Sequence, residues 1–285
     1  EIMPRQEIEK TETPGLAPDD RPAMRRMINQ GWLDMTRLAT MDQVELKSAL
    51  SCLLDDHVAW ITDQEARLGS EIVGFDVAGR DVIDRCKDTN LRLREGMERL
   101  FTDSSALAAF QFANKAMASQ RVQSIYAQNR RRDDTVDVTQ FDKPENRSWR
   151  AFQLAFLLLA IPSLADPTHP DRTSAADALT DLLWFPTGGG KTEAYLGVAA
   201  FAMAMRRLDP DLGGLDASRG LAVIMRYTLR LLTLQQFQRA TALLCAMEVI
   251  RQDDEAQWGA EPFTLGLWVG NRVTPGTTEA AKSAL

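Results

Sequence analysis

The sequence has few of the residues that stabilise secreted or metal-binding domains. Among its 285 residues there are three cysteines and two histidines. Cys52, Cys86 and Cys245 are far apart, and neither a C-x-x-C pair nor a histidine at metal-ligand spacing occurs. This pattern excludes a disulfide framework and a zinc-type site. We expect buried thiols in a reducing compartment.

Long hydrophobic runs are lacking as well. The longest apolar run, residues 154–165, is too short to span a membrane and contains Pro162. The N-terminus is polar and charged, unlike a signal peptide. These features predict a soluble cytoplasmic protein that does not associate with a membrane.

An excess of positive charge is also absent, because the net charge is −7. This balance argues against nucleic-acid binding by bulk attraction. Residues 219–251 nevertheless contain five arginines against one acid, Glu248. Such a local basic strip is the arrangement that can contact a phosphate backbone.

The first half of the chain has a helical pattern. Residues 1–21 are rich in proline and acid and lack periodicity, so we expect a linker or arm. Residues 22–145 repeat apolar side chains every three or four positions, which predicts an α-helical N-terminal domain. Within it, Ser104 or Ser105 is the expected N-cap of a helix that runs to about residue 129.

From residue 146 onward, helices are expected to alternate with short apolar runs. Helices are predicted over residues 149–159, 192–208 and 229–251, and strands over residues 182–185, 221–227 and 263–269. This alternation predicts an α/β fold with a parallel sheet between covering helices. We expect residues 146–285 to form a RecA-like P-loop NTPase domain, with its ligand at the carboxyl end of the first strand.

A glycine-rich segment at residues 186–192 reads P-T-G-G-G-K-T and links the first predicted strand to a helix. Glycines there allow a tight turn whose N–H groups point inward, and the helix begins with its positive end at the same place. Thr187, Gly188, Gly189 and Gly190 are therefore expected to cradle phosphates. Lys191 would reach the β- and γ-phosphates of ATP, and the Thr192 hydroxyl would bind Mg²⁺.

The segment departs from the general G-x-x-x-x-G-K-[ST] pattern, because Phe185 stands where a small residue is expected. It is similar to the A-x-T-G-x-G-K-T variant of superfamily 2 helicases. Upstream, residues 149–153 read W-R-A-F-Q and resemble the element with which many of these enzymes read adenine. The resemblance assigns Arg150 and Gln153 to nucleotide binding, and a glutamine amide can both donate to and accept from an adenine edge.

Downstream, residues 224–239 stand where the helicase family has motif Ia, which grips one nucleic-acid strand. Arg226, Thr228 and Arg230 fit this role, since the start of a helix and an arginine fork both suit a phosphate. A basic helix packed on a sheet is the alternative. His169 has no partner suggested by the pattern, so we expect it on a loop surface.

Two parts of such an ATPase are missing from the pattern. No convincing D-E-x-x motif ends a strand, and no second motor domain with an arginine finger follows. We therefore expect the chain to be truncated before motif II and to be inactive in hydrolysis by itself.

Longer stretches strengthen the resemblance. Residues 149–159, 165–172, 181–197 and 225–233 together resemble the large superfamily 2 helicases of DISARM anti-phage systems. The resemblance implies a much longer ATP-dependent DNA helicase or translocase, which engages single-stranded regions or duplex ends and associates with the DISARM protein DrmB. Two alternatives stay open. One is a nucleotide-binding switch or assembly module without translocation, and the other is a motor subunit of a restriction-type nuclease.

Overall fold

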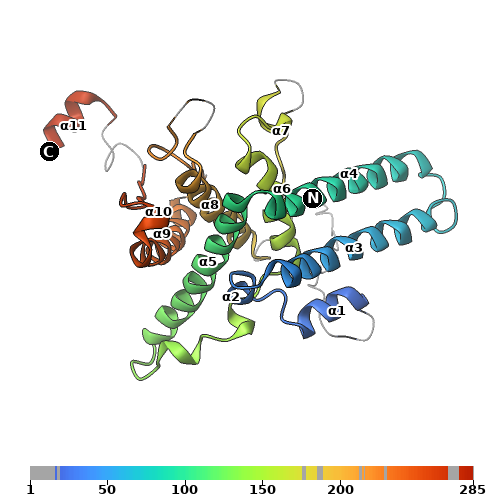
Figure 1. Cartoon of the computed structure of the whole chain (residues 1–285), viewed down its shortest axis with the longest axis horizontal. Coiled ribbons are helices and arrows are strands. Elements are labelled where there is room, and N and C mark those ends of the chain that lie inside the picture. The colour runs from blue at the N-terminus through green and yellow to red at the C-terminus, as the bar shows by residue number, and fades with distance from the viewer. Residues whose placement is uncertain are drawn as a thin grey trace, which may run out of the picture.

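The computed structural model describes residues 17, 20–174, 178–184, 189–211, 214, 216–227, 230–268 and 276–284. These residues form helices joined by loops (Figure 1). The α-helices are α1 Pro22–Asn29, α2 Met35–Leu38, α3 Gln43–Arg67, α4 Asp76–Thr102, α5 Ser104–Arg130, α6 Ala151–Ala165, α7 Pro170–Thr173, α8 Lys191–Leu208, α9 Arg230–Asp253, α10 Glu255–Trp258 and α11 Thr278–Ala284. Two short 3₁₀ helices, η1 Val138–Gln140 and η2 Pro144–Asn146, lie between α5 and α6.

The predicted parallel sheet is wrong. Residues 182–184, 221–227 and 263–268, the described parts of the three predicted strands, have no regular secondary structure, and β-pairing within the described residues is limited to isolated bridges. Several of their apolar side chains are open to solvent, with Leu182 82%, Trp184 86% and Ile224 79% exposed. A strand depends on a neighbour for its backbone hydrogen bonds, and a short apolar run does not specify one. The fold described here is all-helical.

The predicted helices are confirmed, although several of their ends differ from expectation. Asp103, rather than Ser104 or Ser105, caps α5, because its carboxylate accepts from the backbone N–H groups of Ser105 at 2.9 Å and Ala106 at 3.1 Å. Helix α6 continues to Ala165, past Pro162.

Helix α5 lies at the centre of the fold. It packs against α2, α4, α8 and α9, and small or apolar side chains are buried on all its sides, as expected for a helix surrounded by others. One cluster of buried apolar side chains extends from Met24 in α1 to Phe263 beyond α10. The predicted division of the chain into two domains at residue 145 stays a prediction, because this buried cluster includes residues from both sides of that position.

Helices α3 and α4 form an antiparallel pair that projects from the rest of the molecule (Figure 1). The other end of α4 packs on α6, where Gly96 faces the Leu158 carbonyl. Pro162 has no N–H to donate to that carbonyl within the helix. A glycine allows the two backbones to approach at this point, and its Cα–H can serve as a weak donor. Within the described residues, no helix is long and apolar enough to cross a membrane.

The Gly96 contact gives a stability test. A Cβ on Gly96 would lie 2.0 Å from the Leu158 carbonyl oxygen, a backbone atom that cannot turn aside. We expect Gly96→Ala to lower the free energy of unfolding by about 1–3 kcal/mol, measured by denaturant titration. In the control Gly79→Ala, the new Cβ meets only the flexible Leu68 side chain. That variant should be as stable as the unchanged protein or more stable, since alanine favours the helix. Equal losses in the two variants would contradict this account of the α4–α6 contact.

Candidate nucleotide-binding site

The described end of the glycine-rich segment, Gly189 and Gly190, forms the turn at the start of α8. Gly190 is the N-cap and has φ +91°, a left-handed conformation that side chains disfavour. Lys191 and Thr192 are the first two residues of the helix, and both are half-buried. Gly189 lies just before the cap, while Thr187 and Gly188 lie outside the described residues. The predicted helix after the glycines is therefore present, while the phosphate-binding role of the segment stays a prediction.

Helix α6 holds this turn by hydrogen bonds to its carbonyl groups. Arg150 Nη1 donates to the Gly189 carbonyl at 2.6 Å, and Gln153 Nε2 donates to the Gly190 carbonyl at 2.7 Å. Gln153 Oε1 in turn accepts from the backbone N–H of Arg150 at 2.8 Å. The fold thus brings together six of the predicted residues, although Gln153 and Gly190 are 37 residues apart in the sequence: Arg150, Gln153, Gly189, Gly190, Lys191 and Thr192.

The Gln153 amide is engaged at both ends in this structure. Its side chain is buried, with the residue 4% exposed, and both its oxygen and its nitrogen bond to backbone groups. Each bond uses one of two positions, because an amide oxygen has two lone pairs and an amide nitrogen has two N–H groups. Its adenine-reading role stays a prediction, and its observed role is to fix the turn.

The start of α6 is itself held by a buried tryptophan. The Trp149 backbone N–H donates to the Leu33 carbonyl at 2.9 Å, and its indole N–H donates to Asn114 Oδ1 at 2.7 Å. On its other side, the Trp149 ring contacts α8 at Gly197, where a Cβ would lie 2.7 Å from the ring. Gly197 therefore allows α8 to pack closely against the residue that precedes Arg150.

A buried carboxylate, which the sequence pattern did not single out, lies beside the turn. Glu193 is 8% exposed, and its Oε1 accepts from Arg121 Nη1 of α5 at 3.3 Å and from Arg239 Nη2 of α9. Arg121 also donates from Nε to the Asn146 carbonyl at 3.2 Å. These bonds tie the first turn of α8 to two other helices and to the segment before α6. An acid three positions after the helix cap is a sequence signal that could have identified Glu193.

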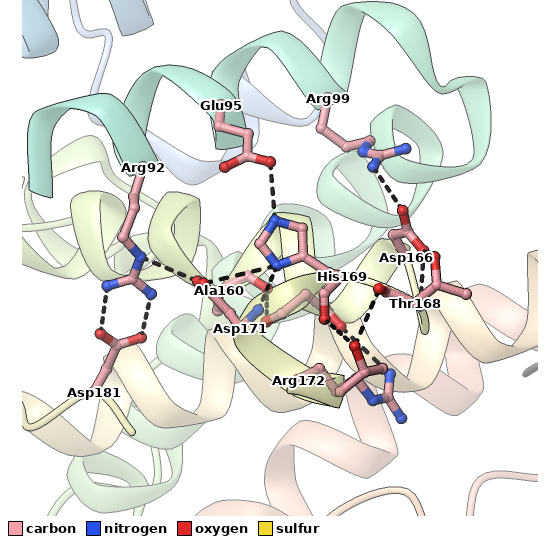
Figure 2. A network of polar contacts seen from close by, with 12 residues as sticks. Arg92, Glu95, Arg99, Ala160, Asp166, Thr168, His169, Asp171, Arg172 and Asp181 are labelled. Atoms are coloured by element: carbon pink, nitrogen blue, oxygen red, sulfur yellow. Dashed lines mark hydrogen bonds and ion pairs between the residues drawn. The ribbon is translucent and has the colours of Figure 1, made fainter. Parts of the chain in front are cut away.

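A second polar cluster fixes the segment that leads to the turn (Figure 2). Arg92, Glu95 and Arg99 lie along one face of α4, above residues 166–172 and Asp181. Arg92 holds Asp181 through two bonds, at 2.8 and 2.9 Å, and reaches Asp171 at 3.2 Å. Arg99 pairs with Asp166 at 3.3 Å. The hydrogen bond of Arg92 to Asp181 is the main reason that the Arg92 pKa is raised.

His169 belongs to this cluster, so its expected place without a partner on a loop surface is wrong. Its Nε2 lies 2.9 Å from Glu95 Oε1, and its Nδ1 accepts from the Asp171 backbone N–H at 3.2 Å. These two bonds suit a neutral ring with the proton on Nε2. The partner is 74 residues away in the sequence, which is why local spacing could not reveal it.

The residues predicted to contact nucleic acid are less completely described. Arg226 is exposed, Thr228 lies outside the described residues, and Arg230 begins α9. Next to Arg226, burial raises the pKa of the Tyr227 phenol above its ordinary value. Their assignment to nucleic acid stays a prediction.

Comparison with known proteins gives one informative similarity. No family model matches the chain. It is 37% identical over 249 residues to the DISARM protein DrmA of Bacillus paralicheniformis (strain ATCC 9945a / NCIMB 11709 / CD-2). The matched region covers 86% of this chain and 21% of that protein. The similarity supports a DrmA-like relation for a chain that spans about a fifth of its relative's length.

The α4 cluster gives a local test. Arg92→Gln removes the partner of Asp181 and Asp171, so residues 178–184 should open more readily. We expect their backbone amides to exchange hydrogen about tenfold faster or more, since hydrogen bonds to charged groups contribute about 1.5–3 kcal/mol. The control is Arg85→Gln on the same helix, where the Arg85 side chain is 77% exposed and forms a surface ion pair with Asp81. Unchanged exchange in Arg92→Gln would show that the cluster does not hold this segment.

Proposed function

We propose that this chain binds ATP with Mg²⁺ at the turn that opens α8. The observation that carries the proposal is the left-handed Gly190 turn, followed directly by Lys191 and Thr192 and held by Arg150 and Gln153. A turn of this kind presents backbone N–H groups and the positive end of an 18-residue helix to the same point. Phosphate oxygens are the ligands that suit such a point.

The side chains at the turn have different proposed roles in binding. Lys191 supplies a charge for the β- and γ-phosphates, and the Thr192 hydroxyl supplies one ligand to Mg²⁺, whose other ligands are phosphate oxygens and waters. Arg150 and Gln153 keep the turn in place from α6. The half-buried positions of Lys191 and Thr192 fit these roles, because they limit competition from bulk water.

The whole protein to which this chain corresponds is proposed to act in defence against phage, as the name of its relative DrmA indicates. Its proposed activity is that of an ATP-dependent superfamily 2 DNA helicase or translocase, which engages single-stranded regions or duplex ends and works with DrmB. The resemblance of residues 149–159, 181–197 and 225–233 supports this assignment. Hydrolysis is assigned to the longer protein and not to this stretch alone.

Nucleic acid is proposed to contact the segment before α9. Arg226 is exposed there, and Arg230 opens α9 within the strip that has five arginines against one acid. The start of α9 offers backbone N–H groups to a phosphate as α8 does. Such contacts act through the backbone of the nucleic acid and carry no sequence preference.

Replacement of Lys191 tests nucleotide binding. In the full-length protein, Lys191→Ala should weaken binding of ATP·Mg²⁺ about 10- to 100-fold, since a charge-assisted contact worth about 1.5–3 kcal/mol is lost. Isothermal titration calorimetry measures the effect. Lys143→Ala, which removes an exposed lysine before η2, should bind as the unchanged protein does. Equal affinity of all three proteins would exclude the turn as the phosphate site.

A salt titration tests the nucleic-acid contact. If Arg226 neutralises one phosphate, Arg226→Ala should weaken binding of single-stranded DNA alike for all sequences and reduce the slope of log K against log[salt] by about one. The matched control is Arg219→Ala, whose side chain is 76% exposed and already pairs with Glu261 at 3.0 Å. An unchanged affinity and slope for Arg226→Ala would favour a nucleotide-dependent switch over a motor.

A further inference from the structure

Glu193 occupies the position from which an acidic side chain usually caps its own helix. Gly190 is the N-cap of α8 and Glu193 is the third residue after it. A glutamate there commonly reaches back to the N–H of the cap, and the helix dipole favours it. The Glu193 side chain is close enough to Gly190 for such a bond, because a Cβ built on Gly190 would lie 3.6 Å from Glu193 Oε2.

In this structure the Glu193 carboxylate binds arginines from two other helices. Glu193 Oε1 is bound by Arg121 from α5 and by Arg239 from α9. Among the hydrogen bonds of the described residues, none joins the Glu193 carboxylate to the Gly190 N–H. The two arginines come from different helices and meet at one oxygen. The arginine side chains are 34% and 35% exposed, whereas that of Glu193 is 10% exposed.

This arrangement affects any anion at the turn. A carboxylate that capped α8 would occupy a backbone N–H group that phosphates use and would repel their charge. We propose that Arg121 and Arg239 are positioning residues that hold Glu193 away from the N-terminus of α8 and so keep it free for phosphate. The inference rests on the proposed binding of nucleotide at this turn.

The proposal predicts that a second substitution restores the ATP affinity lost in an Arg239 variant. If Arg239 instead contacted the phosphate directly, no such recovery would be expected. Arg239→Gln removes one of the two arginines that hold Glu193 and so lets this carboxylate compete for the helix cap. ATP·Mg²⁺ should then bind about tenfold more weakly to the full-length protein, the size of effect expected for a helix cap. The double variant Arg239→Gln/Glu193→Ala removes the competing carboxylate and should regain affinity to within about twofold of the unchanged protein. Glu193→Ala alone should bind at least as tightly, and Arg239→Lys, which keeps the charge, should lose little.

Calorimetry with ATP·Mg²⁺, together with a thermal unfolding curve for each variant, decides between the outcomes. The proposal is overturned if the double variant binds no better than Arg239→Gln, or if Glu193→Ala weakens binding as much as Arg239→Gln does. Glu193→Ser replaces the alanine variant if the latter does not fold. If neither variant folds, Glu193 is required for the fold itself and the proposal fails. Absence of ATP binding by the unchanged protein would instead refute the proposed function.

Discussion

The hydrogen bonds between α6 and the glycine-rich turn are the constraint on which the candidate site depends. Without these bonds, the two glycines at residues 189–190 could adopt many backbone conformations. Fixing one of them costs conformational entropy. Arg150 and Gln153 each donate to one carbonyl of the turn, which points the opposite, N–H side of these peptides away from α6. The turn is therefore shaped by residues 37 and 39 positions before the glycines that they bind.

The surroundings of the turn explain how an acidic protein can offer an anion site. The net charge of the chain is −7, yet Arg121 and Arg239 bind Glu193, Arg150 binds the turn, and Lys191 begins α8. Because these charges come from α5, α6, α8 and α9, the packing of α8 and α9 on the central α5 creates the local field. The buried contacts of Trp149 with Asn114 and Gly197 set the distance between α6 and α8.

Sequence reasoning predicted the helices and the location of the turn, because both depend on local patterns. Apolar residues at three- and four-residue steps specify a helix wherever they occur. The strands at residues 182–185, 221–227 and 263–269 were wrong in their described parts, since a strand needs a pairing partner that an apolar run does not identify. The roles of Glu193 and His169 were missed for a related reason. Their partners Arg121, Arg239 and Glu95 are 46 to 74 residues away, and only the packing of helices brings them together.

The central claim is that the turn at the start of α8 binds nucleotide phosphates. Hydrogen exchange measured with and without saturating ATP·Mg²⁺ tests it most directly, because bound phosphates should protect the backbone N–H groups they accept from. The account predicts that protection of the full-length protein in this region is strongest at residues 189–193 and weaker in the rest of α8. ATP-dependent protection confined to other segments, with these amides unchanged, would contradict it.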